Sequence, residues 1–171
     1  PLLPKRRKLT MQQARDYGCT MGDLIWVAAH SDDADVKRRF QFWLSDVAAR
    51  VLPIFEKAHP DDARPREAIE TLRRYAVGEV DCSDLRNAAD AGDAAAGAAY
   101  ATTYVATCAV YAATCAVDAA AGAAGAATYV ATCATRASTY DGKAEREWQF
   151  DRLCVWFSDN EPEPLPLGDG A

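Results

Sequence analysis

Apolar residues recur in the first half of the chain at the spacing of an amphipathic helix. One such stripe comprises Val36, Phe40, Trp43, Leu44 and Val47. Side chains three and four positions apart lie on the same face of an α-helix. Asp32 or Asp33 precedes the stripe, and an aspartate can accept the free backbone N–H groups of a first helical turn. The pattern therefore predicts a helix that begins after these aspartates and buries one face.

Two shorter helices are predicted between Thr10 and Ala29, with a break around Gly18 to Gly22. The apolar residues of the second of these helices are Leu24, Ile25, Trp26 and Val27. Further along, Pro53 removes a backbone donor and clashes with the preceding turn. We therefore expect residues 51–58 to form a kinked or separate continuation of the long helix.

A polar connector covers residues 59–65, and Pro65 suits the first turn of the next helix, where a missing N–H costs nothing. The residues of that helix expected to face inward are Ala68, Ile69, Leu72, Tyr75 and Ala76. Gly78 ends the helix, and Asp81 or Ser83 caps the one that follows.

About half of residues 88–137 are alanine, the residue with the best helix propensity. The heptapeptide Thr-Tyr-Val-Ala-Thr-Cys-Ala occurs at residues 103–109 and again at 128–134. Helical spacing places two sets of residues on stripes: Tyr104, Cys108, Tyr111 and Cys115 on the first, and Tyr129, Cys133, Arg136 and Tyr140 on the second. A reversal near residues 122–125 pairs these stripes in an antiparallel helical hairpin. Either the seam is solidly packed, with its cysteines buried, or a pocket is lined by Tyr104, Tyr111, Tyr129 and Arg136.

Residues 144–157 are predicted to form a last helix, anchored by Trp148, Leu153, Val155 and Trp156. Three segments follow from these patterns: a basic N-terminal arm at residues 1–9, an all-helical domain at 10–158, and an acidic, proline-rich, disordered tail at 159–171. The predicted fold class is all-α, a single-domain antiparallel helical bundle with closely packed, Ala-rich helices.

The formal net charge of the chain is −6 and its pI is about 4.9. An acidic protein is a poor partner for nucleic acid or an anionic membrane, and a better one for a basic protein. The uncharged run at residues 94–117 is long enough to span a membrane, but its Ala, Thr, Gly and Cys content does not favour insertion. Six cysteines without a Cys-x-x-Cys pair favour reduced thiols and a cytoplasmic location.

The residues offer little for catalysis. The two histidines, His30 and His59, fall at predicted helix ends beside aspartates, where a capping or surface role is expected. The cysteine spacing does not match a zinc site, and no glycine-rich phosphate loop follows a strand. We therefore expect no catalytic residues, no metal and no cofactor, and hence a protein that is not an enzyme.

Six charges occupy ten residues around the start of one predicted helix: Asp61, Asp62, Arg64, Arg66, Glu67 and Glu70. A second charged group, Glu145, Arg146, Glu147 and Arg152, surrounds Trp148. Each group is consistent with a solvated helix face, a salt-bridge network or a recognition surface.

Four motifs carry a resemblance to a known family. They are Val-Leu-Pro-Ile-Phe-Glu at residues 51–56, Pro-Asp-Asp-Ala-Arg-Pro-Arg-Glu-Ala-Ile-Glu at 60–70, Gly-Glu at 78–79, and Trp-Gln with Arg-Leu at 148–153. Over residues 34–153 the chain resembles a family of small bacterial immunity proteins of polymorphic-toxin systems, the immunity-protein-five-like family. The resemblance implies a protein that neutralises a cognate toxin and carries over no catalytic residue. The chain departs from the family in its Ala-rich helices, which hold Tyr, Thr and Cys where the family has histidines.

Two functions remain open. The leading hypothesis is a non-enzymatic binding protein that blocks a basic toxin by protein-protein contact, with Asp61, Asp62, Arg64, Arg66, Glu67, Glu70, Trp148 and Arg152 as candidate contacts. The alternative is a helical protein that binds or sequesters a small anionic or nucleotide-like ligand, for instance in phage or prophage counter-defence, with Arg64 and Arg66 holding the anion. Homo-oligomers are compatible with both.

Overall fold

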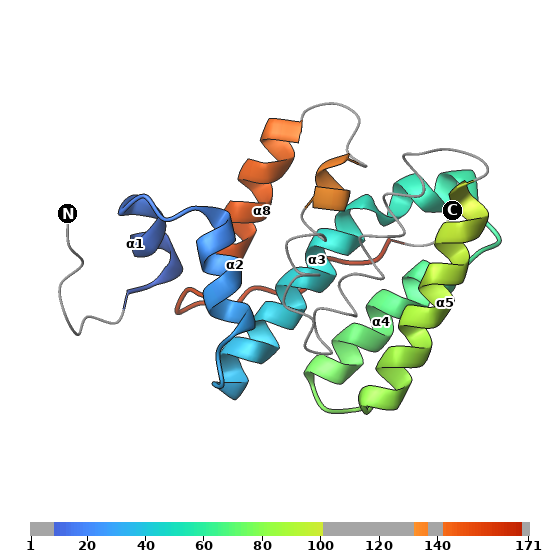
Figure 1. Ribbon diagram of the computed structural model, residues 1–171, viewed down its shortest axis with the longest axis horizontal. Helices are drawn as coiled ribbons and strands as arrows, with labels where there is room; N and C mark the ends of the chain where they lie inside the picture. The colour runs from blue at the N-terminus through green and yellow to red at the C-terminus, as the bar shows by residue number, and fades with distance from the viewer. Residues whose placement is uncertain (1–8, 101–131, 137–141, 169–171) are drawn as a thin grey trace.

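The computed structural model describes residues 9–100, 132–136 and 142–168, and every regular element among them is a helix. The helices are α1 (Met11–Asp16), α2 (Met21–Ala29), α3 (Ala34–Ala58), α4 (Arg64–Ala76), α5 (Cys82–Tyr100) and α8 (Gly142–Trp156). In Figure 1, α3 runs between α1, α2 and α8 on the left and α4 and α5 on the right. The predicted all-α fold class is confirmed.

Local capping determines where these helices begin. Thr10 and Thr20 each form a capping box with the residue three positions later. The Asp33 carboxylate accepts hydrogen bonds from the N–H groups of the first turn of α3, and Asp81 does the same for α5. Gly78 has a φ of +78°, which a residue without Cβ adopts readily after a helix end. The predicted caps of α3 and α5 and the predicted end of α4 at Gly78 are confirmed, whereas α2 begins at Met21, within the predicted break.

The central helix α3 supplies most of the core. Its fully buried apolar side chains include Trp43, Leu44, Val47, Ala48, Val51, Leu52 and Phe55. Residues of α2, α4 and α8 pack against it, among them Ile25, Ile69, Leu72, Leu153 and Trp156, each at most 2 % exposed. α4 and α5 in turn pack side by side (Figure 1). The predicted stripe on α3 is therefore the centre of the core.

The structure corrects two details of these expectations. α3 continues through Pro53 to Ala58 as one helix, which excludes a separate segment at residues 51–58 and leaves a kinked continuation as the remaining alternative. Val155 is 42 % exposed, although it was expected to be an anchor of the last helix. Trp26 and Val27 of α2 are also exposed, at 61 % and 54 %. The Trp26 ring stacks on His30 at 4.5 Å between centroids and so covers part of its apolar surface locally.

Residues 159–168 lie against the bundle, which differs from the disordered tail that their composition predicts. Leu165 and Leu167 pack against the core, and the Leu165 N–H donates a hydrogen bond to Asp46 at 2.7 Å. The guanidinium groups of Arg152 and Arg66 donate to the carbonyl oxygens of Glu163 and Gly168. Contacts to distant residues therefore order this part of the tail.

Most of the repeat lies outside the described residues, including Tyr104, Cys108, Tyr111, Cys115 and Tyr129, so the hairpin stays a prediction. Residues 132–136 are helical, and Cys133 is 2 % exposed. None of the described helices has the length and apolar character needed to cross a membrane.

Candidate functional site

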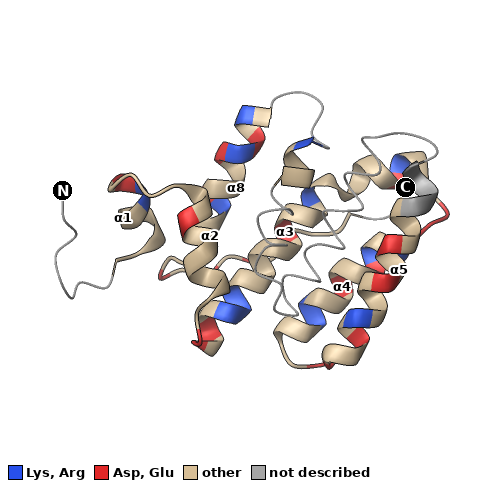
Figure 2. Ribbon diagram, in the orientation of Figure 1, with Lys and Arg blue, Asp and Glu red and all other residues tan. Residues whose placement is uncertain are grey.

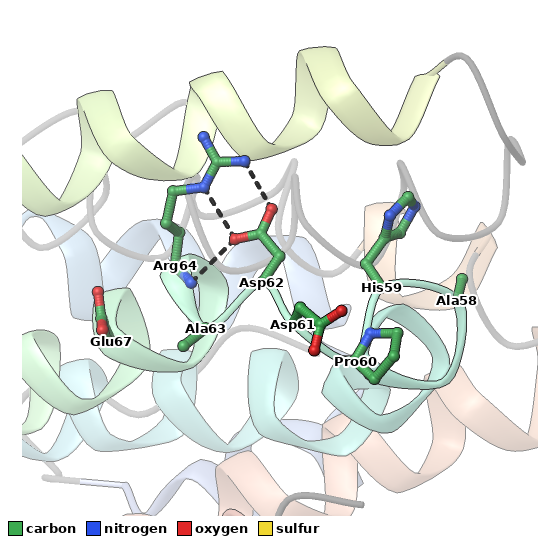
Figure 3. Close-up of a pocket in the computed structure, with 8 residues that line it drawn as sticks. All are labelled: Ala58, His59, Pro60, Asp61, Asp62, Ala63, Arg64 and Glu67. Atoms are coloured by element: carbon green, nitrogen blue, oxygen red, sulfur yellow. Dashed lines mark hydrogen bonds and ion pairs between the residues drawn. The ribbon is translucent and has the colours of Figure 1, made fainter.

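The turn between α3 and α4 carries the densest group of predicted binding residues (Figure 3). α3 ends at Ala58, and His59 follows as its C-cap, with its N–H donating to Phe55 and its ring stacked on the Phe55 ring. The Asp62 N–H then donates to the His59 carbonyl at 3.1 Å and closes the turn. Pro65 stands in the first turn of α4, as predicted. The chain reverses here within a few residues and presents their side chains together.

Asp62 and Arg64 fix the shape of this turn. The Asp62 carboxylate accepts from Arg64 Nε at 2.8 Å, from Nη2 at 2.6 Å and from the backbone N–H at 3.2 Å. These bonds lower the pKa of Asp62 and raise the pKa of Arg64. The pair is bidentate, so the positive charge of Arg64 is directed at its own neighbour.

An open depression of about 690 Å³ lies on the turn, lined by residues 58–64 and Glu67. A second depression of about 450 Å³ continues from it between α4 and α5, and Arg64 and Glu67 belong to both. We call the two together the acidic groove. Its charged residues are Asp61, Asp62, Arg64, Glu67, Arg74, Glu79 and Asp84.

Carboxylates outnumber guanidinium groups in the acidic groove by five to two, and both arginines are already paired. Arg64 contacts Asp62 at 2.6 Å, and Arg74 contacts Glu79 at 3.5 Å. Asp61, Glu67 and Asp84 are exposed to solvent. Further acidic residues follow α4 and α5 beside the groove (Figure 2). The groove therefore presents net negative charge to any partner that approaches it.

Two predicted residues of this segment lie outside the groove lining. Arg66 pairs with Glu56 at 2.6 Å and donates to the Gly168 carbonyl at 2.9 Å, so it holds the tail. Glu70 is exposed on α4 but does not line either depression. Arg64 and Arg66 therefore do not converge on one anion, and the structure gives no support to that arrangement.

Trp148 and Arg152 lie elsewhere, at α8. Arg50 stacks over the Trp148 ring at 4.2 Å and bonds the buried carboxylate of Glu145 at 2.8 Å. Arg152 belongs to a group around Asp46, which we call the Asp46 cluster: Ser45, Asp46, Arg73, Arg152, Trp156 and the Leu165 backbone N–H. Glu145 and Arg152 therefore fit a salt-bridge network better than a recognition surface, two of the roles expected for this charged group.

Asp46 is fully buried, and both of its carboxylate oxygens have donors. Oδ2 accepts from Arg152 Nε at 2.7 Å and Trp156 Nε1 at 2.8 Å, while Oδ1 accepts from Leu165 N–H at 2.7 Å and Arg73 Nη2 at 3.4 Å. Burial lowers the pKa of Arg73. The Asp46 cluster joins α3, α4, α8 and the tail around a carboxylate that is itself buried from solvent.

Neither the Asp46 cluster nor the part of the groove between α4 and α5 was predicted from the sequence. A signal for Asp46 was available, because it lies three residues after Trp43 and four after Phe42, within an otherwise apolar buried stripe. A charge at such a position needs an internal partner. Arg74, Glu79 and Asp84 had no comparable signal, since only the packing of α5 on α4 brings them beside Glu67.

Arg136 does line a cavity, together with Met21, Ile25 and Arg146, while the tyrosines expected around it lie outside the described residues. Within the described ranges, no three His, Cys, Asp or Glu side chains are grouped as metal ligands.

A family comparison gives this arrangement a context. Residues 33–155 match the family model described as Imm-5 like putative immunity protein. The chain belongs to that family. No curated protein and no solved structure matches the chain. The Imm-5 like match includes the whole acidic groove and Asp46, but it ends one residue before Trp156 and does not reach the tail that completes the Asp46 cluster.

Proposed function

We propose that this chain neutralises a cognate protein toxin by binding it non-enzymatically, with the acidic groove as the contact surface. Its membership of the Imm-5 like family supports toxin neutralisation as the activity. The observation that supports the groove is its excess of exposed carboxylates around two arginines that are already paired. The action belongs in the cytoplasm of the producer cell, the compartment favoured by the cysteine pattern.

The charge of the groove defines the partner as a basic surface. Complementary potentials speed the encounter of two proteins and select against partners of the wrong charge. A toxin that acts on nucleic acid would carry such a surface, because phosphate binding requires Lys and Arg. An immunity protein that covers this surface prevents the toxin from binding its nucleic-acid substrate. The immunity protein itself performs no chemical step.

Contacts within the chain support the shape of the groove. Its walls are two packed helices, and the Asp62–Arg64 pair with the His59–Asp62 hydrogen bond fixes the turn at its end. A surface that keeps its shape loses little conformational entropy on association. The Asp46 cluster supports the same function indirectly, because it holds α3 and α4 in place from inside.

The experiment is a growth-rescue assay in cells that express the cognate toxin together with this chain. Asp61→Lys places a positive charge in the groove and should abolish rescue at low expression of the chain. Asp32→Lys is the matched control, since it changes net charge equally at an exposed carboxylate. The control position is also far from the groove. Asp32 lies before α3 and the groove residue His59 lies after it, and a helix of 25 residues separates them by about 37 Å. Full rescue by Asp61→Lys, or equal loss with Asp32→Lys, contradicts the proposal.

A further inference from the structure

Most arginines in the described residues are paired with a carboxylate. Of the twelve arginines in the described residues, nine form such a pair: Arg15, Arg38, Arg39, Arg50, Arg64, Arg66, Arg73, Arg74 and Arg152. The three described arginines outside that set are Arg86, Arg136 and Arg146. Two of these three, Arg136 and Arg146, line the same cavity.

That cavity lies between α2, the helical residues 132–136 and the first turns of α8, and its volume is about 280 Å³. Met21 and Ile25 of α2 give it an apolar wall, and Thr132 and Thr135 lie beside the two arginines. Neither guanidinium has a hydrogen bond or an ion pair to a carboxylate among the described residues. Two positive charges therefore share an apolar-walled space in a protein whose net charge is −6.

We propose that this cavity binds a small organic anion, with Arg136 and Arg146 holding a phosphate or carboxylate group and Met21 and Ile25 contacting an apolar body. Guanidinium groups bind both anions through paired N–H donors. The apolar wall adds affinity for a ligand that carries carbon, which a bare inorganic ion lacks. The volume is close to the lower end of the range of small-molecule sites, about 300 Å³, so the ligand is small.

This site is separate from the acidic groove and does not depend on toxin neutralisation. The groove is lined by the α3–α4 turn, α4 and α5, and none of its residues lines the cavity. A chain that lacks anion binding can therefore still rescue cells from a toxin, and the two proposals fail independently.

The test is a calorimetric titration of the full chain with phenyl phosphate, benzoate and inorganic phosphate. We expect saturable binding of an aryl anion, at least tenfold tighter than inorganic phosphate; comparison of phenyl phosphate with benzoate identifies the preferred charged group. Arg136→Gln and Arg146→Gln should each weaken binding about tenfold or more, the usual effect of losing a charged hydrogen bond. Both arginines are exposed, so neither change should unfold the protein.

Arg86→Gln is the matched control, because Arg86 is an exposed arginine on α5 that pairs with no carboxylate in the described structure and lies outside the cavity. Unchanged affinity in this variant supports the site. No saturable binding of either aryl anion, inorganic phosphate binding as tightly as both, or equal weakening in Arg86→Gln overturns the proposal.

Discussion

The Asp46 cluster and the acidic groove use the same side chains, aspartates and arginines, in opposite ways. In the cluster one carboxylate is fully buried and receives bonds from two arginines, an indole and a backbone amide. In the groove five carboxylates surround two arginines, and most of them face solvent.

Burial decides which of the two regions stabilises the fold. A buried charge that loses its partners keeps its desolvation cost, whereas water replaces the partner of an exposed charge. Breaking the cluster should therefore destabilise the fold, whereas the groove supplies the electric field to which we assign recognition. Substitutions should separate these roles.

The largest effect is expected for Asp46→Ala. This change leaves Arg73 and Arg152 without their shared carboxylate in a buried site, so the free energy of unfolding should fall by about 3–5 kcal/mol. Urea denaturation measures it. Asp61→Ala in the groove should stay within about 0.5 kcal/mol of the unmodified chain. Similar losses in the two variants would remove the distinction between the regions.

A smaller loss is expected for Trp156→Phe. The ring still stacks on Phe42, at 5.1 Å between centroids, but Asp46 loses the indole N–H. A hydrogen bond to a charged group contributes about 1.5–3 kcal/mol, which the same denaturation experiment resolves. Trp26→Phe is the control, because Trp26 is exposed and stacks on His30 without contacting a buried charge. A larger effect at Trp26 would contradict the account.

The smallest effect concerns the tail and depends on pH. A hydrogen bond from Arg38 lowers the pKa of Glu161, so the ionised carboxylate favours the docked tail. This contribution is fully present above the ordinary carboxyl pKa of about 4 and is lost as pH falls through the lowered value. Glu161→Gln should cost about 0.2–1 kcal/mol at pH 7 and progressively less in acid.

Urea midpoints at pH 7 and at successively lower pH test this dependence. Glu163→Gln is the matched control, because Arg152 binds the backbone carbonyl of Glu163. The control should behave like the unmodified chain at every pH. A constant difference between Glu161→Gln and the unmodified chain across the pH range would show that the charge of Glu161 does not hold the tail.

The sequence predicts local features of the fold better than distant ones. Asp33, Asp81 and Pro65 mark helix starts through contacts within a few residues, and these starts are confirmed. The tail was misjudged because Leu165 bonds Asp46 across 119 positions.

In the acidic groove, too, contacts between residues close in sequence were predicted and contacts between distant residues were not. Asp61, Asp62, Arg64 and Glu67 are close in sequence, and the structure brings them together at one turn. The rest of the groove depends on α5 packing against α4, which periodicity does not specify. Arg66 and Arg152 were grouped with the surface by sequence proximity, but each is turned towards a carboxylate on α3.

The central claim, that the acidic groove captures a basic toxin, is tested most directly by the association rate of chain and toxin at increasing salt. The account predicts that Asp61→Lys slows association by about tenfold at low ionic strength, that the difference shrinks as salt screens the charges, and that Asp32→Lys stays close to the unmodified chain. Equal association rates for Asp61→Lys and Asp32→Lys at every salt concentration would contradict it.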